Sequence, residues 1–179
     1  RDGQTMGAGA LTVSRFADTR KVSGTSLGAV TDTYHHDAYG DVDVYDAKVS
    51  GAVAYHVDFV RDLIGRIAQR TETIGGVAHA YEYGYDAAGR LSSVKVDGQT
   101  TAQYTYDANG ARLTATRDGN TATATYDAQD RLQSYSTQQY TYDPNGNLAA
   151  VVSGGARVDY AFDSANRLRA VHLADGTWV

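Results

Sequence analysis

A short turn motif, Tyr-Asp-Xaa-Xaa-Gly, recurs along this 179-residue sequence and constrains its fold more than any other feature. Successive copies from His36 onward are separated by 25, 24, 21, 20, 16 and 20 residues. A near-constant period of this length is typical of repeat architectures, in which each repeat packs against its neighbours. Clear copies begin at Tyr85, Tyr106, Tyr126, Tyr142 and Phe162, partial copies begin at His36 and Arg61, and a degenerate copy begins at Phe16.

The chemistry of the motif predicts a hairpin turn of one backbone shape in every copy. An aspartate that opens a type I turn accepts a hydrogen bond from the backbone two residues on. If a glycine-type bulge closes the hairpin, the residue three positions later needs a positive φ. Gly, Asn and Asp tolerate that conformation best. The aspartates are Asp37, Asp62, Asp86, Asp107, Asp127, Asp143 and Asp163, and the closing residues are Gly40, Gly65, Gly89, Gly110, Asp130, Gly146 and Asn166.

The segments between the turns have the pattern of β-strands. Fourteen Tyr and many Thr residues favour strands, and the rings of Tyr81, Tyr83 and Tyr85 alternate with other residues, which places them on one face. Stacked repeats would build ladders of Tyr across the sheet. Second turns are expected at the far end of each repeat, at Asp97-Gly98, Asp118-Gly119, Asp175-Gly176, Gly75-Gly76 and Gly154-Gly155, and near Ser136–Gln138.

The pattern therefore predicts an all-β chain of antiparallel hairpins that form a curved or spiralling single sheet, because wide open sheets tend to curl. We expect one repeat region over residues 1–179, clear over 34–179 and degenerate or flanking over 1–33. For residues 56–70 an α-helix is an alternative, because the apolar residues there recur at helical spacing. Gly65 and the repeat period favour strand, turn and strand there. The unpaired edges of such a sheet could pair with other strands, including those of a second copy.

Composition excludes several classes of function. The net charge is −5 and no basic run is present, which argues against nucleic acid as a partner. The sequence has no apolar stretch long enough to span a membrane as a helix. It has no Cys, and His35-His36-Asp37 lacks a third ligand at a recognisable spacing, so no metal and no cofactor are expected. The Asp143–Asn147 segment has its glycine in the wrong position for a calcium loop.

No catalytic constellation stands out, and the motif residues are more simply explained by structure. Each motif aspartate has a turn role, so a pair of catalytic carboxylates is not indicated. Arginines recur just after the turn at Arg66, Arg90, Arg112, Arg131 and Arg167. We expect them to stack on Tyr rings of an adjacent repeat or to pair with motif aspartates, rather than to form a row that faces a ligand.

The segments "YDAAGRL", "YDANGARL", "YDPNGNL" and "FDSANRL" resemble RHS repeats, which are also called YD repeats. The resemblance covers residues 30–179 well. In bacterial RHS polymorphic toxins, the BC component of insecticidal Tc toxins and teneurin-like proteins, such repeats form a long β-strip that spirals into a hollow shell. The positions carried over are structural: the Asp and closing residues above, the aromatics Tyr85, Tyr106, Tyr126, Tyr142 and Phe162, and Arg90, Leu91, Arg131, Leu132, Leu148, Arg167 and Leu168.

The resemblance implies a non-enzymatic structural segment, an arc of a shell that encapsulates a C-terminal toxic domain of a larger secreted or cell-surface protein. The expected partners are the remainder of that shell and the enclosed domain. The protease with an Asp-Pro-Xaa-Gly signature found in toxin members has no counterpart here, because Pro144 belongs to a repeat turn. The alternative is a module whose Tyr-lined face binds carbohydrate or a cell-surface protein.

Overall fold

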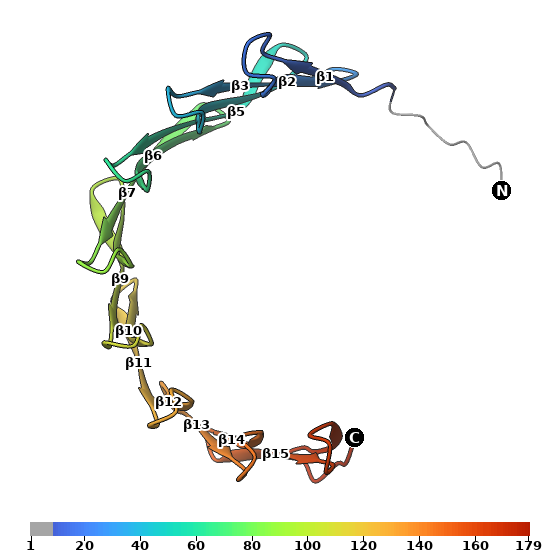
Figure 1. Ribbon diagram of the computed structural model, residues 1–179, viewed down its shortest axis with the longest axis vertical. Coiled ribbons are helices and arrows are strands. Elements are labelled where there is room, and N and C mark those ends of the chain that lie inside the picture. Colours follow the sequence, from blue (N-terminus) through green and yellow to red (C-terminus); the bar gives the residue numbers. More distant parts are fainter. Residues whose placement is uncertain (1–8) are drawn as a thin grey trace, which may run out of the picture. The chain divides into compact units, whose positions relative to one another are not determined.

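The computed structural model describes residues 9–179, and these residues are all β-structure (Figure 1). Within them, sixteen antiparallel strands follow one another in chain order in a single open sheet, and helices are absent. This confirms the predicted fold class. No helix in the described residues could cross a membrane. Of the region expected to be degenerate, residues 1–8 lie outside the described part. Contacts divide the chain into two units, Arg1–Thr100 and Thr101–Val179.

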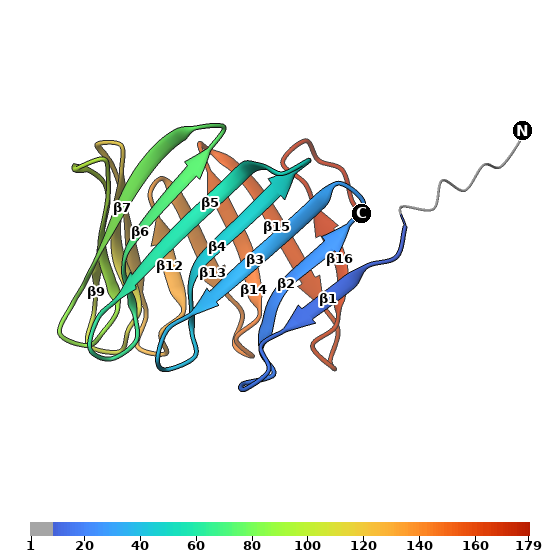
Figure 2. The same ribbon diagram turned by 90° about the horizontal axis from the view of Figure 1, so that it is seen from above.

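The first unit is a run of hairpins in one layer. Figure 2 shows β2, β3, β4 and β5 side by side, each antiparallel to the next. Its longest strand, β5, has 10 residues, whereas the strands of the second unit have 4 to 8 residues. Its strands are β1 (Thr12–Arg15), β2 (Val22–Leu27), β3 (Val30–His36), β4 (Val42–Val49), β5 (Ala52–Arg61), β6 (Ile67–Ile74), β7 (Val77–Tyr85) and β8 (Leu91–Val96).

The second unit repeats the same hairpin plan with shorter strands. After the last strand, residues 177–179 turn back, and Val179 exchanges two backbone hydrogen bonds of 2.9 Å with Val171. The strands are β9 (Gln99–Tyr106), β10 (Arg112–Arg117), β11 (Asn120–Tyr126), β12 (Leu132–Tyr135), β13 (Gln138–Tyr142), β14 (Leu148–Ser153), β15 (Ala156–Phe162) and β16 (Leu168–His172).

The two faces of the sheet differ in chemistry. Residues that pair directly across antiparallel strands share a face. One face of the second unit carries hydroxyl pairs, Thr105 with Thr114 at 2.6 Å and Thr116 with Thr121 at 2.8 Å. The other face carries Tyr rings over small residues, and Ala115 lies opposite Tyr104. The buried apolar residues are accordingly few and mostly small: Val57, Ala102, Ala115, Ala124 and Ala150.

Two alternatives for individual segments are settled by the strands. Residues 56–70 form the end of β5, a turn and the start of β6, so the helical alternative is wrong. The second turn of the repeat that begins at Tyr126 has no glycine. It falls at Ser136, whose φ is 54°, inside the predicted segment Ser136–Gln138. The paired glycines Gly75-Gly76 and Gly154-Gly155 have positive φ throughout, as two-residue hairpin turns of type I′ require.

The turn predicted at Asp175-Gly176 is present and has the hydrogen bonds of a motif turn: Leu173 donates to the carbonyl of Thr177 at 2.8 Å, and Gly176 donates to that of Leu173 at 3.0 Å. One expectation needs correction, because a continuous ladder of Tyr rings is not formed. Tyr–Tyr ring contacts join Tyr34 to Tyr45 and Tyr45 to Tyr55 in the first unit. Tyr81 and Tyr83 lie opposite Val96 and Val94 rather than opposite other rings, and Arg70 lies over the ring of Tyr81.

Candidate functional site: the stacked motif turns

All seven predicted motif turns share one backbone geometry. In the turn that begins at Asp86, the N–H of Asp86 donates to the carbonyl of Arg90 at 2.9 Å, and the N–H of Gly89 donates to that of Asp86 at 2.9 Å. The other six repeat both bonds, at 2.8 to 3.0 Å and at 2.9 to 3.3 Å. The closing residues all have positive φ: Gly40 88°, Gly65 86°, Gly89 81°, Gly110 95°, Asp130 59°, Gly146 88° and Asn166 58°.

The aspartate side chain holds each turn from inside. One carboxylate oxygen of Asp86 accepts the N–H groups of Ala88 at 3.0 Å and Arg90 at 2.9 Å. Hydrogen bonding to the Arg90 N–H lowers the pKa of Asp86 below its ordinary value, desolvation opposes this, and the Arg90 guanidinium lowers it further. The pKa values of Asp127 and Asp163 are lowered in the same way, by the N–H groups of Arg131 and Arg167. The lowered pKa values keep Asp86, Asp127 and Asp163 ionised as acceptors.

Arg131 and Arg66 each make both of the contacts expected for the arginine after the turn. Arg131 Nε donates to the second carboxylate oxygen of Asp127 at 2.7 Å, and its guanidinium lies 4.7 Å from the ring centre of Tyr142 in the next repeat. Arg66 likewise pairs with Asp62 and lies 4.1 Å from the ring centre of Tyr85. Arg90 and Arg167 pair with Asp86 and Asp163. Arg66 and Arg131 thus join their own turns to the following repeat.

In three of the clear repeats the tyrosine reaches back to the preceding repeat. The hydroxyl of Tyr142 donates to the carbonyl of Leu132 at 2.9 Å, and that of Tyr85 donates to the carbonyl of Ile67 at 2.7 Å. The hydroxyl of Tyr126 donates to the carbonyl of Arg112 at 3.0 Å. Each acceptor is the residue that begins the second strand of the preceding hairpin, here called the Leu position. This contact was not predicted, because it depends on which strands pair and in what register.

Three copies depart from tyrosine at this position, where they carry His36, Arg61 and Phe162, and the last two depart in different ways. Arg61 occupies the Tyr position, and its guanidinium donates to the carbonyl of Val42 at 3.2 Å, which is the Leu position of the preceding repeat. Phe162 occupies the same position without a hydroxyl. The requirement at this position is therefore a flat side chain that fills the same space, with a hydrogen-bond donor at its end in most copies.

The Leu positions themselves lie opposite the aromatic residue of their own turn. Tyr85 pairs with Leu91, Tyr126 with Leu132, Tyr142 with Leu148 and Phe162 with Leu168, each across a bulge in register. In the copy at Tyr106 this place is taken by Arg112, and Ala111 occupies the Arg position, where its N–H donates to Asp107 at 2.8 Å. Arg112 was therefore assigned to the wrong position by the sequence pattern.

Neighbouring turns also touch through polar side chains. The Asn109 amide donates to Asp130 at 2.9 Å, and the Asn147 amide donates to Asn166 at 2.9 Å. Asn147 also donates to Asp143 at 2.9 Å and so takes the role that arginine has in other repeats. The Asp143–Asn147 segment is an internally bonded turn.

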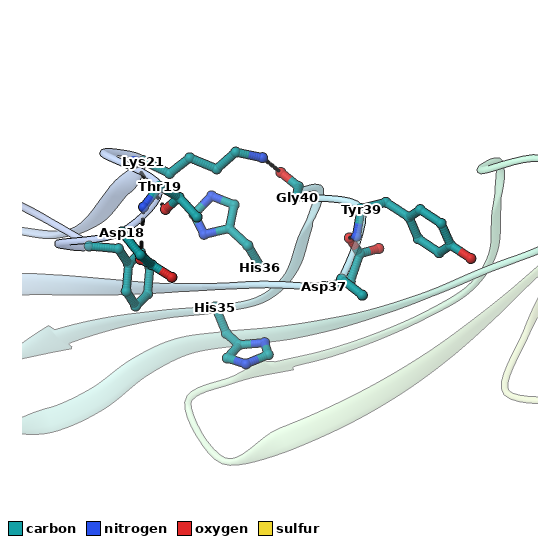
Figure 3. Close-up of a pocket in the computed structure, with 10 residues that line it drawn as sticks. Asp18, Thr19, Lys21, His35, His36, Asp37, Tyr39 and Gly40 are labelled. Carbon is teal, nitrogen blue, oxygen red and sulfur yellow. Dashed lines mark hydrogen bonds between the residues drawn. The ribbon is translucent and has the colours of Figure 1, made fainter.

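The histidines at the first partial copy of the motif make separate contacts. Figure 3 shows His35 and His36 on opposite sides of their strand. His35 bonds to Asp43 at 2.6 Å, while His36 packs edge-on against Phe16 with ring centres 5.7 Å apart. A pocket of about 440 Å³ lies between residues 16–21 and residues 35–40, and Lys21 donates across it to the carbonyl of Gly40. In the described part of the chain, no group of three or more His, Cys, Asp or Glu residues is arranged to hold a metal.

A charged cluster on β4 and β5 was missed by sequence reasoning. Both ring nitrogens of His56 are bonded to carboxylates, Nδ1 to Asp46 at 2.7 Å and Nε2 to Asp58 at 2.8 Å. The bond to Asp46, then that to Asp58, raises the pKa of His56, although desolvation opposes them. The signal existed only in the strand register, which places Asp46 directly opposite His56.

The comparisons with known proteins agree with this geometry. A family model described as "Teneurin YD-shell" matches residues 1–178. Human Teneurin-4 is 31% identical over 122 residues, which cover 65% of this chain and 4% of that protein. Human Teneurin-1 is 30% identical over 135 residues, which cover 73% of this chain and 5% of that protein. The chain thus spans about 4–5% of the length of these curated relatives.

Among solved structures, similarity was found to components of Tc toxins. A TcdB2-TccC3 structure without the hypervariable C-terminal region has 14% identity and a TM-score of 0.48, with 92% of this chain and 13% of that chain covered. The Photorhabdus luminescens Tc holotoxin pore has 14% identity and a TM-score of 0.46, with the same coverage. The family itself is established by the match over nearly the whole sequence: the chain belongs to the teneurin YD-shell family.

Proposed function

We propose that this chain is a non-enzymatic structural segment of a YD-shell, and that the shell encloses a C-terminal toxic domain of a larger secreted or cell-surface protein. The partners in this proposal are the remainder of the shell and the enclosed domain. The motif residues named above serve the wall of the shell and bind no substrate. The family match supports the shell role, and the enclosed domain is the finer part of the proposal.

One observation carries the proposal: the motif side chains are engaged by other repeats. Arg131 is bonded to its own turn and stacked on Tyr142, and the Tyr142 hydroxyl is bonded back to Leu132. Such reciprocal contacts make each repeat depend on its neighbours, as in other repeat proteins. A strip of this kind is suited to form a wall.

Protease protection in the full-length parent protein tests the enclosure. The domain that follows the shell should resist a protease in the intact parent and be cleaved when it is produced alone. Gly146→Val, which strains a wall turn, should increase cleavage of that domain, whereas Gly146→Asn should not. Equal cleavage of the domain in the parent and in isolation would exclude enclosure.

A second candidate function is recognition of carbohydrate or a cell-surface protein by the Tyr face. The observation that favours it is the cluster of Tyr34, Tyr45 and Tyr55, whose neighbouring ring centres are 4.9 and 6.0 Å apart. Desolvation raises the pKa values of Tyr45 and Tyr55, as expected for rings with apolar bodies and polar tips. A glycan array and calorimetry with Tyr45→Ala as control test this candidate, and no binding in a broad panel would remove it.

We also propose that the first strand is a joint to other strands of the parent shell. All four residues of β1 are exposed, and its pairing partner is β2 on one side. An exposed strand edge invites pairing with another strand. Sedimentation of the isolated 179-residue chain should show self-association, and Val13→Lys should weaken it. A chain that stays monomeric at high concentration would contradict this assignment.

A further inference from the structure

Two neighbouring turns of the first unit carry large apolar side chains at their tips. Tyr39 is 94% exposed, Leu63 106% and Ile64 74%. The corresponding central residues of the other motif turns are small or polar: Ala87-Ala88, Ala108-Asn109, Ala128-Gln129, Pro144-Asn145 and Ser164-Ala165. The turn geometry is the same in all of them, so the backbone does not require these side chains. Exposed apolar groups in contiguous patches mark surfaces that bind other molecules.

A cleft of about 680 Å³ lies between these two turns. Its apolar wall consists of Tyr39, Phe59, Val60, Leu63 and Ile64. Figure 3 shows the Tyr39 ring projecting from its turn on the side away from Lys21. The cleft has the volume of a small binding site, enough for a few side chains. We call it the turn-tip cleft.

The rim of the turn-tip cleft is negatively charged. Asp37, Asp41, Asp43 and Asp62 line it, and Arg61 is the cation among the lining residues. Asp62 is also paired with Arg66, and Asp43 is bonded to His35, so Asp37 and Asp41 are the carboxylates most available to a ligand. Arg61 is already engaged, because its guanidinium donates to the carbonyls of Val42 and Gly65 at 3.2 Å each. The side chain of Asp41 is 57% exposed and lies 3.9 Å from Arg61 Nε. A molecule that enters the cleft therefore meets apolar side chains inside and an excess of carboxylates around them.

We propose that the turn-tip cleft binds a segment of another polypeptide that carries aliphatic side chains flanked by lysine or arginine. The aliphatic groups contact Leu63 and Ile64, and the cations meet the rim carboxylates and the Tyr39 ring. A second copy of this chain would bring the same carboxylates into the contact and be repelled, and an anionic lipid surface would be repelled too. The charge pattern therefore selects a cationic polypeptide segment.

Fluorescence anisotropy with a labelled hexapeptide of alternating lysine and leucine tests the proposal on the 179-residue chain. Two control peptides replace lysine by glutamate or leucine by serine. We expect the lysine–leucine peptide to bind about tenfold more tightly than either control, since both charge and apolar contact contribute. The variant Leu63→Ser/Ile64→Ser should lose about tenfold in affinity. Asp41→Asn should reduce both the affinity and its dependence on salt.

The matched control is Ala128→Ser/Gln129→Ser, which alters the tip of another motif turn. It should bind the peptide as the unaltered chain does, and circular dichroism verifies that all variants are folded. Equal binding by Leu63→Ser/Ile64→Ser and the unaltered chain would overturn the proposal. Two other results would also overturn it: binding to phosphatidylcholine vesicles that requires Leu63, or self-association of the chain that the same double variant abolishes.

Discussion

The hydroxyl of the repeat tyrosine provides a quantitative test of how the repeats hold together. Tyr142 donates to the Leu132 carbonyl at 2.9 Å, whereas Phe162, in the same position one repeat later, has no hydroxyl to offer Leu148. A typical protein hydrogen bond contributes about 0.5–1.5 kcal/mol net. Tyr142→Phe should therefore lower the free energy of unfolding by about 1 kcal/mol. Phe162→Tyr should raise it by up to the same amount, because it adds the bond that the other repeats make.

Urea denaturation followed by circular dichroism measures both effects. With a slope of about 2–3 kcal/mol per molar urea, a change of about 1 kcal/mol moves the midpoint by about 0.3–0.5 M. Because repeat proteins do not always unfold in one step, amide hydrogen exchange around Leu132 and Leu148 should accompany the midpoint. Tyr39→Phe is the control, since that side chain is 94% exposed, and it should leave the midpoint unchanged. Equal midpoints for Tyr142→Phe and Tyr39→Phe would refute the reasoning.

The turn backbone should be equally sensitive: Gly146→Val forces a β-branched residue to a φ near 88° and should cost about 1–3 kcal/mol in a urea melt, whereas Gly146→Asn should cost less than about 1 kcal/mol. Arg131→Ala should lower the midpoint more than Arg167→Ala, because the Arg131 side chain is 33% exposed and stacked and that of Arg167 is 79% exposed. Since the pKa of His56 is raised, chiefly by Asp46, its stabilisation is complete below the unfolded pKa of about 6.5 and is lost as pH rises through the folded value. His56→Gln should remove that decline from a pH series of melts. The lowered pKa values of Asp86 and Asp127 act oppositely, and the stabilisation that these two aspartates contribute should be lost as pH falls through those values.

The turns and strands were predictable because their causes are local. A positive φ at the closing residue selects Gly, Asn or Asp, so residue type alone places Asp130 and Asn166 in the same slot as the glycines. Period-2 alternation then places the Tyr rings on one face. The helical spacing of apolar residues in 56–70 suggested a helix as an alternative. This alternative is wrong because the turn at Gly65 divides the segment into two strands.

The contacts between repeats were less predictable because they depend on strand register. The role of Arg61 as a donor to Val42 cannot be deduced from a position where tyrosine is usual. The His56 cluster needs the pairing of β4 with β5, and the apolar tips at Leu63 and Ile64 are meaningful only once exposure is known. Arg112 was misplaced because "GARL" and "GRL" differ by one residue, and the turn itself fixes which residue reaches the aspartate.

The way in which Arg131 and Tyr142 link neighbouring hairpins has an evolutionary consequence. These side chains reach only from one hairpin to the next, so the repeat carries its own adhesive contacts on both sides. Recombination between two copies of the motif would delete or duplicate a whole hairpin and leave the new neighbours with the same complementary surfaces. A gene of this kind can therefore change the length of its product by whole repeats, without compensating mutations elsewhere in the sheet.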